Sequence, residues 1–292
     1  MDNSSSNFSY EKLWKSIIRP PRDIYSENDL GSKRYKRNNN KFYTRTDYSI
    51  MSSRGFLIKC SFYEEELSTR ENFLMPVVIY LHGNSSSRIE GKKMSNYLFD
   101  YNINSFIFDF PGCGLSEGNY ISLGYHEKKD IKLIIDFIEK LPGVGNIGLW
   151  GRSMGAATTL LYSYCDKRIK AICIDSPFSD IIYLAKDLCY QYAKVPGFIV
   201  NSGLSFIKKT IKAINDTDLD NIKPIDFCGM SFIPAFFIHA KYDELIPYEH
   251  SLSMFEKYNG KKFITVVEGG HNTIRGINVV NNVCLFFQKY LQ

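Results

Sequence analysis

The chain has 292 residues, of which 44% are apolar, and a net charge of +5. This length supports one large domain with a deep core, or two small ones. The sequence lacks a run of about 18 apolar residues and begins with a polar stretch, so we expect neither a membrane-spanning helix nor a signal peptide.

Seven cysteines stand at scattered positions, and none forms a Cys-x-x-Cys pair. An odd number of cysteines without such pairs indicates reduced thiols rather than a disulfide framework or a zinc site. We therefore expect a cytoplasmic protein.

The positive charge is concentrated near the N-terminus. Residues 12–45 contain ten lysines and arginines against three acidic residues, a net charge of +7 that leaves −2 for the remainder. Such a segment either wraps its own domain or contacts an anionic membrane surface. We expect a basic arm over 1–40, partly disordered because its start is rich in Ser and Asn, followed by a domain over 41–292.

Apolar runs alternate with amphipathic segments along the rest of the chain. The pattern predicts an antiparallel hairpin over 42–51 and 55–63, followed by short apolar strands typical of a parallel sheet. We expect these strands at 77–81, 105–110, 147–150, 171–175, 235–238 and 263–267. We expect helices at 89–101, 126–141, 156–164, 248–258 and 277–290. The alternation indicates an α/β fold with a mostly parallel central sheet flanked by helices.

One stretch breaks this alternation. Residues 181–232 are long for a connection between strands and predict a small helical cap above the C-terminal edge of the sheet. Within it, Leu204, Ile207, Ile211 and Ile214 recur at helical spacing, with lysines between them. This stripe either packs on the chain's own domain or forms a cationic lid that rests on a membrane.

The most informative motif is Gly-Arg-Ser-Met-Gly at 151–155, between a predicted strand and a predicted helix. A tight turn at this point leaves no room for side chains two positions from the serine and exposes its hydroxyl at the strand end. The motif predicts Ser153 as a nucleophile and the backbone N–H of Met154 as one oxyanion donor. Arg152 and Lys241, near the serine, favour a substrate with a carboxylate or phosphate group.

A serine nucleophile requires a base and an acid that orients the base. His271 follows the last predicted strand in a glycine-rich loop that can return the imidazole to Ser153, so we expect His271 to be the base. Asp243, which follows the preceding strand, is the expected acid. Asp175 and Glu244 are the alternatives.

His82-Gly83-Asn84 ends the first buried strand. A turn at this position supplies an oxyanion donor, which we assign to the backbone N–H of Asn84, with Ser85 as the alternative. We expect His82 itself to tie two loops together.

In chain order, the motifs are HGN at 82–84, DFPGCGLS at 109–116, GRSMG at 151–155, DSPF at 175–178, Asp243, and GGHN at 269–272. This set resembles the α/β-hydrolase superfamily from about residue 17 to residue 287. It is most similar to an intracellular eukaryotic branch of serine-aminopeptidase-like hydrolases that includes membrane-associated protein depalmitoylases. The IRPPR segment at 18–22 also resembles an N-terminal signature of that branch.

The resemblance implies an α/β-hydrolase fold and a Ser-Asp-His triad made of Ser153, Asp243 and His271. The depalmitoylases carry an acylated N-terminal cysteine cluster, whereas the first cysteine of this chain is Cys60. That membrane-anchoring device is therefore absent from the sequence.

We expect a serine hydrolase that cleaves an ester, thioester or amide through an acyl-enzyme, with an esterase or acyl thioesterase favoured. A serine peptidase of aminopeptidase type and a non-enzymatic scaffold on a hydrolase fold are the alternatives. We expect no cofactor and no metal. The expected partner is a small-molecule or acylated substrate; a peripheral membrane contact through the arm or the cap is a further hypothesis, and no nucleic acid is expected.

Overall fold

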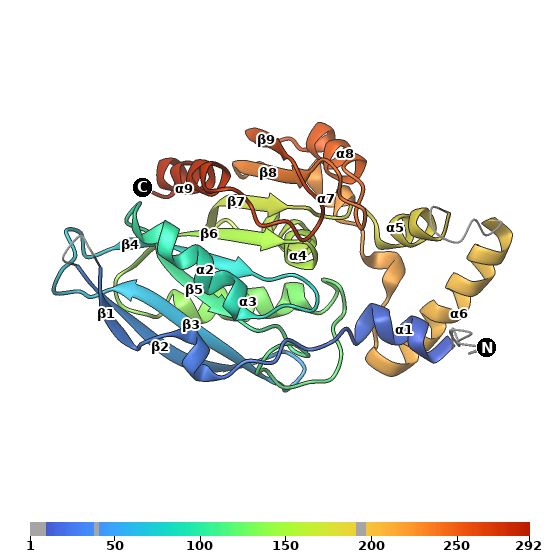
Figure 1. Cartoon of the computed structure of the whole chain (residues 1–292), viewed down its shortest axis with the longest axis horizontal. Coiled ribbons are helices and arrows are strands. Elements are labelled where there is room, and N and C mark those ends of the chain that lie inside the picture. The colour runs from blue at the N-terminus through green and yellow to red at the C-terminus, as the bar shows by residue number, and fades with distance from the viewer. Residues whose placement is uncertain (1–9, 38–40, 191–196) are drawn as a thin grey trace, which may run out of the picture.

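The computed structural model describes residues 10–37, 41–190 and 197–292. Residues 1–9, which belong to the segment expected to be disordered, lie outside this range. The described residues form a nine-stranded sheet in the order β1-β2-β3-β5-β4-β6-β7-β8-β9 (Figure 1). The strands are β1 (Arg34–Lys36), β2 (Phe42–Met51), β3 (Leu57–Glu65), β4 (Met75–Leu81), β5 (Asn104–Phe108), β6 (Val144–Arg152), β7 (Ile169–Asp175), β8 (Ala235–Ala240) and β9 (Lys262–Val267).

The sheet is antiparallel from β1 to the β3–β5 pair and parallel from β5 to β9. Every residue of β4, β5 and β8 is buried, as expected for strands covered on both faces. The parallel strands therefore direct their carboxyl ends to one common edge. The expected hairpin is confirmed, with Met51 opposite Leu57 at its turn.

Helices cover both faces of the sheet. The α-helices of the described residues are α1 (Tyr10–Ile18), α2 (Arg88–Phe99), α3 (Glu127–Ile138), α4 (Met154–Ser163), α5 (Ile181–Leu188), α6 (Gly197–Asn215), α7 (Ile225–Cys228), α8 (Glu249–Lys257) and α9 (Ile277–Leu291). Alternate residues of β4 belong to two different apolar clusters, Val78 and Tyr80 to one and Val77 and Ile79 to the other. The first cluster packs against α2 and α9, and the second against α3 and α4. The mostly parallel sheet between two helical layers is the predicted fold class.

The described part of the basic arm packs on the domain. Ile18 at the end of α1 is fully buried, and β1 pairs with β2 at the edge of the sheet. Arg22 donates hydrogen bonds to the carbonyl oxygens of Ser116 (3.1 Å) and Gly118 (2.5 Å). Several of the cations that made this segment conspicuous thus hold it to its own chain.

The cap contains α5, α6 and α7, and Figure 1 shows α6 beside α1 at one end of the molecule. In α6, Leu204, Ile207 and Ile211 are 8%, 5% and 0% exposed, whereas Ile214 is 38% exposed. Three of the four residues of the stripe thus pack on the chain itself, and contact of the cap with a membrane stays a prediction. No helix in the described residues is long and apolar enough to cross a membrane.

Candidate active site

The turn between β6 and α4 has the geometry that the glycine pattern predicts. Ser153 has φ 52° and ψ −117°, a conformation that is strained for a non-glycine residue. A Cβ atom on Gly151 would lie 2.3 Å from the carbonyl oxygen of Gly155, and one on Gly155 would lie 2.0 Å from that of Leu81. Only glycine fits at both positions. The backbone N–H of Ser153 donates to the carbonyl oxygen of Asp175 at 2.8 Å, which ties the turn to β7.

The structure brings together the three residues expected to form a triad. His271 Nε2 lies 3.0 Å from Ser153 Oγ, and His271 Nδ1 lies 2.7 Å from Asp243 Oδ2. Asp243 and His271 are both buried, although they lie on loops that follow two different strands, β8 and β9. This chain of hydrogen bonds can move a proton from the serine hydroxyl to the imidazole while the carboxylate stabilises the resulting imidazolium.

Asp243 is held as a carboxylate. Its Oδ1 atom accepts hydrogen bonds from the backbone N–H groups of Leu245 (3.0 Å) and Ile246 (2.8 Å). Burial raises the pKa of Asp243, but hydrogen bonds from His239 and His271 outweigh burial and hold that pKa well below its usual range. The group therefore stays charged near neutral pH.

His239 is a supporting residue that the sequence analysis missed. It lies buried within β8, with its Nε2 atom 3.4 Å from Asp243 Oδ2. Its Nδ1 atom contacts Ser251 Oγ at 2.6 Å and its Nε2 atom contacts the carbonyl oxygen of Ile246 at 2.8 Å. His239 precedes Asp243 by four residues, and this spacing was the available signal. The sequence alone does not show that the two side chains meet.

The two alternative acids are placed differently. Arg275 donates to both oxygens of Asp175, from Nε at 2.9 Å and from Nη2 at 2.8 Å. Glu244 is exposed beside Gly270, where an added Cβ would meet its carboxylate. His271 Nδ1 contacts Asp243, at 2.7 Å, and the carboxylate of Asp175 is held by Arg275 instead.

The expected oxyanion loop passes directly beside the serine. A Cβ atom on Gly83 would lie 3.6 Å from Ser153 Cβ, and Asn84 follows in the chain. Met154 is the first residue of α4, where backbone N–H groups have no partner within the helix. Both assigned donors thus belong to backbone next to Ser153, and Ser85, the alternative, is exposed with φ 53°.

His82 ties two loops together, as predicted. Its Nδ1 atom lies 2.7 Å from the carbonyl oxygen of Gly83, and its Nε2 atom accepts the backbone N–H of Phe110 at 3.0 Å. The turn after β4 is therefore fastened to the turn after β5.

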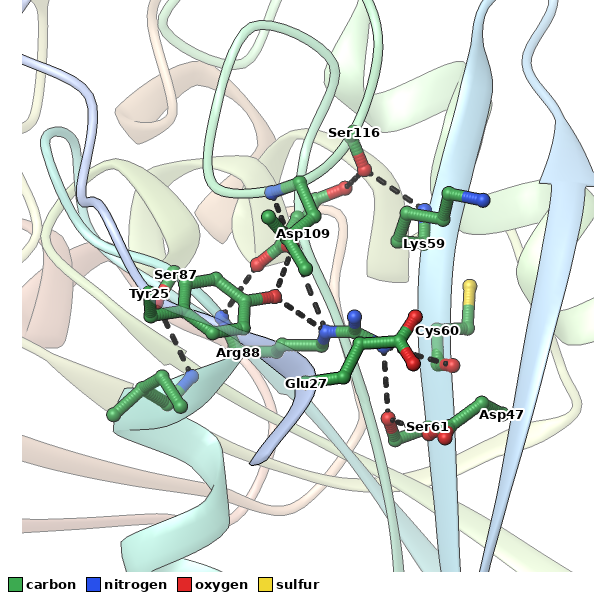
Figure 2. Close-up of polar contacts among 12 residues, drawn as sticks. Tyr25, Glu27, Asp47, Lys59, Cys60, Ser61, Ser87, Arg88, Asp109 and Ser116 are labelled. Carbon is green, nitrogen blue, oxygen red and sulfur yellow. Dashed lines mark hydrogen bonds and ion pairs between the residues drawn. The ribbon is translucent and has the colours of Figure 1, made fainter. Parts of the chain in front are cut away.

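A buried ionic network holds the far end of the same loop (Figure 2). Asp109 accepts hydrogen bonds from the backbone N–H of Arg88 (2.7 Å), the backbone N–H of Leu115 (2.9 Å) and the hydroxyl of Tyr25 (2.5 Å). The guanidinium of Arg88 donates to that hydroxyl at 2.6 Å and to Ser61 Oγ at 2.9 Å. Because Arg88 begins α2 a few residues after the HGN turn, this network fixes where that turn ends.

The network gives a structural role to the DFPGCGLS motif at 109–116. In the sequence analysis this motif served only as part of the resemblance to a known family. Asp109 and Arg88 are 0% and 1% exposed and form an ion pair at 3.5 Å. Gly114 has φ +46°, and an added Cβ would lie 2.4 Å from the carboxyl carbon of Asp109. The signal in the sequence was Asp109, an aspartate near the end of the otherwise mostly apolar run at 105–110. The sequence does not reveal that Arg88 is its partner.

Arg152 already has partners within the chain. Its Nη1 atom lies 2.8 Å from Glu90 Oε1, and its Nη2 atom donates to the carbonyl oxygen of His271 at 2.9 Å. The expectation that its charge favours a carboxylate or phosphate stays a prediction. Lys241 is exposed and lies 3.9 Å from Glu268.

Comparison with known proteins places this geometry in context. The family model for X-Pro dipeptidyl-peptidases (S15 family) matches residues 104–228. The uncharacterised protein YqkD of Bacillus subtilis (strain 168) is 28% identical over 201 residues, which cover 68% of this chain and 65% of YqkD. Lysophosphatidylserine lipase ABHD12 of Xenopus tropicalis is 30% identical over 201 residues, which cover 64% of this chain and 46% of the lipase. The matched part of the chain thus spans less than two thirds of the length of either relative.

Solved structures agree on the fold. An esterase of Pyrococcus furiosus superposes with a TM-score of 0.68 at 21% identity and covers 94% of this chain and 98% of its own. Acetyl xylan esterase 1 of a Thermoanaerobacterium species superposes with a TM-score of 0.64 at 16% identity, covering 97% and 93%. The relation to the depalmitoylase branch stays a prediction. From the sheet order, the serine turn and these structural similarities, we conclude that the chain adopts the α/β-hydrolase fold.

Proposed function

We propose that this protein is a serine hydrolase that acts through an acyl-enzyme. The observation that carries the proposal is the hydrogen-bonded series Ser153–His271–Asp243, with the serine on a strained turn at the edge where the parallel strands end. A serine, an imidazole and a carboxylate in this geometry form the arrangement that activates a hydroxyl for attack on a carbonyl carbon.

In the first half of the reaction, His271 Nε2 accepts the proton of Ser153 as Oγ bonds to the substrate carbonyl carbon. The backbone N–H groups of Asn84 and Met154 stabilise the negative oxygen, each contributing roughly 3 kcal/mol to the transition state. His271 then protonates the leaving group as its bond to carbon breaks. In the second half, His271 removes a proton from water, whose oxygen attacks the acyl carbon. His271 then returns the proton to Ser153 Oγ as its bond to the acyl carbon breaks, which releases the acid and restores the serine hydroxyl.

The substrate we favour is an ester or thioester of an acyl chain. Proteins named as lysophosphatidylserine lipases and as esterases are among those similar to this chain. Apolar side chains also remain exposed on the loops of the acid and the base, with Tyr242 and Leu245 flanking Asp243 and Ile274 following His271. Such side chains suit contact with an acyl chain.

Labelling with a fluorophosphonate probe tests the proposal. We expect the wild-type protein to be labelled, and Ser153→Ala and His271→Ala to lose labelling. Ser68→Ala is the matched control, because it removes an exposed hydroxyl from the connection between β3 and β4, outside the loops that carry Ser153, Asp243 and His271. Absence of labelling in the folded wild type, or labelling that persists in Ser153→Ala, contradicts the proposal and favours a non-enzymatic scaffold.

A peptidase is the second candidate, because the matching family model describes X-Pro dipeptidyl-peptidases. A panel of acyl 4-nitrophenyl esters, acyl-CoA thioesters, lysophospholipids and X-Pro dipeptidyl amides separates the two activities. We expect the oxygen esters and thioesters to give the higher kcat/KM. Faster turnover of the amides would assign the protein to the peptidases.

A further inference from the structure

Arg152, the residue before the nucleophile, links three loops of the active site. Its Nη2 atom donates to the carbonyl oxygen of His271 at 2.9 Å and approaches Asn272 Oδ1 at 3.3 Å. Its Nη1 atom pairs with Glu90 Oε1 at 2.8 Å. One guanidinium group, anchored at the end of β6, thus contacts the loop of the base on one side and α2 on the other.

Glu90 extends the connection to the oxyanion loop. While its Oε1 atom accepts from Arg152, its Oε2 atom accepts the backbone N–H of Gly83 at 3.3 Å. The side chains of Arg152 and Glu90 are 19% and 17% exposed, so most of this ion pair is shielded from water. A pair with this little exposure is screened less by salt than a surface pair.

We propose that Arg152 and Glu90 are positioning residues that hold His271 and the oxyanion loop at their working distances from Ser153. The proposal rests on the proposed serine-hydrolase function. Neither residue takes part in proton transfer; each acts through backbone groups of the loops that carry the base and the oxyanion donor.

The loop of His271 needs such a support. Gly269 and Gly270 precede the histidine, and Gly269 has φ +108°, a conformation that glycine adopts without steric cost. The loop holds its glycines through hydrogen bonds from the Gly270 N–H to Thr273 Oγ1 (2.9 Å) and from the Tyr242 N–H to the carbonyl oxygen of Gly269 (3.0 Å). Asp243 fixes the imidazole ring and stands on a separate loop. Arg152 adds a contact to the carbonyl oxygen of His271 itself, and its loss would let His271 shift relative to Ser153; a displacement of about 1 Å can lower a rate by about 10²-fold.

A second arginine braces the loop from the opposite direction. Arg275 donates to the carbonyl oxygen of Thr273 at 2.9 Å while it holds the carboxylate of Asp175 in β7. The carbonyl oxygen of Asp175 in turn accepts the backbone N–H of Ser153. Arg152 therefore reaches from the serine turn to the loop, and Arg275 reaches from the loop back to the strand that supports the serine turn.

Arginine is required at position 152 because its planar guanidinium presents several N–H groups in fixed directions at once. A lysine retains the charge, but its ammonium group has no fixed fork with which to serve Glu90 and the His271 carbonyl together. The chemistry therefore predicts that Arg152→Lys retains only part of the function of the pair.

Steady-state kinetics on the acyl 4-nitrophenyl ester that the wild type cleaves best in the panel above tests the proposal. We expect Arg152→Gln to lower kcat by about 10–100-fold with KM changed less than threefold, because the side chain faces loops rather than substrate. Arg152→Lys should lie between this variant and the wild type. The matched control is Arg168→Gln, which removes an arginine that pairs with Asp136, Glu139 and Asp166 away from the site; its kcat should stay unchanged.

A double-mutant cycle tests whether the two residues act as one unit. Glu90→Ala should lower kcat by a factor similar to that of Arg152→Gln, and the double variant should be no worse than the poorer single variant. If the losses in kcat of the two single variants multiply in the double variant, the two residues act independently, and the paired mechanism is overturned.

Hydrogen exchange of backbone amides separates failure of this proposal from failure of the proposed function. We expect Arg152→Gln to accelerate exchange over 268–275 and 83–87, whereas Arg168→Gln leaves both segments unchanged. Arg152→Lys serves for the same measurement should Arg152→Gln not fold. Missing fluorophosphonate labelling of the wild type refutes only the hydrolase assignment. Unchanged exchange in both segments, or kcat within twofold of the wild type in Arg152→Gln, overturns the positioning role.

Discussion

The loops after β7 and β8 begin alike and serve different purposes. Each starts at the carboxyl end of a buried parallel strand and presents an aspartate, Asp175 at 2% exposed and Asp243 at 7% exposed. Asp175 pairs with the guanidinium of Arg275, whereas Asp243 pairs with the imidazole of His271. The carboxylates have the same chemistry, so their partners create the difference.

A guanidinium stays protonated at any pH at which a protein is folded, so the Asp175–Arg275 pair can only hold elements together. An imidazole gains and loses a proton near neutrality, so the Asp243–His271 pair can take part in a reaction. The comparison predicts that removing Asp243 affects catalysis and that disrupting the Asp175 pair affects stability.

The largest expected effect follows from Asp243→Asn. An amide at this position neither stabilises the imidazolium nor fixes the working tautomer of His271, so kcat should fall by about 10⁴-fold. The rate of hydrolysis of an acyl 4-nitrophenyl ester measures the loss in kcat. Asp175→Asn is the companion variant and should lower kcat by less than tenfold; the reverse ranking would show that Asp175 is the acid.

Breaking the other pair should cost stability. Arg275→Gln leaves the carboxylate of Asp175 buried without its cation, and we expect a loss of about 3–5 kcal/mol in the free energy of unfolding. Urea denaturation monitored by tryptophan fluorescence measures it. Arg34→Gln, which disrupts an exposed ion pair with Glu66, should change stability by less than about 1 kcal/mol. Equal losses in the two variants would refute the structural role of the Asp175 pair.

A third buried aspartate, Asp130, extends the comparison of Asp175 with Asp243, because it has no cation or imidazole bonded to its carboxylate among the described residues. Asp130 in α3 is 0% exposed; Oδ1 accepts the backbone N–H of Ser53 at 3.4 Å, and Oδ2 has no hydrogen-bond partner among the described residues. Burial and the charge of Glu127 raise its pKa to about 7, against the opposing effects of Arg54 and Lys129.

The folded state therefore binds a proton at Asp130 more tightly than the unfolded state does. The contribution of this group to stability is greatest below about pH 4 and declines as the pH rises towards 7. We expect Asp130→Asn to stabilise the protein at pH 8, by on the order of 2–4 kcal/mol, and to flatten this dependence. Urea midpoints measured between pH 4 and 8 test it; a destabilised variant at pH 8 would show that the carboxylate is favourably solvated.

The smallest effect is expected at Glu244, the exposed neighbour of the acid. Glu244→Gln removes one charge from the surface, and we expect kcat to change by less than threefold and stability by less than about 0.5 kcal/mol. The same kinetic and urea measurements apply. A large kinetic loss in this variant alone would mean that the carboxylate next to Asp243 orients the base.

Most of the fold could be predicted from the sequence because local periodicity reports burial directly. Fully apolar runs marked the strands from β4 to β8, and the expected boundaries differ from the structure by a few residues. The strand expected at 105–110 ends instead at Phe108, because the chain turns where Asp109 faces the start of α2 and Pro111 follows. The sequence left two interpretations of the α6 stripe open, because an amphipathic pattern does not identify what covers its apolar face; the structure buries three of its four residues against the chain itself.

The sequence by itself determined the chain order of the serine, the aspartate and the histidine, and the glycines without which the turn at Ser153 cannot form. These are local properties, since they depend on backbone sterics and on where strands end. The tertiary structure decided the pairings. Arg152 reaches Glu90 across 62 positions and His271 across 119, and Arg275 meets Asp175 across 100. Such contacts exist only once the sheet order brings the strand ends together, because a charge in a sequence carries no record of its partner.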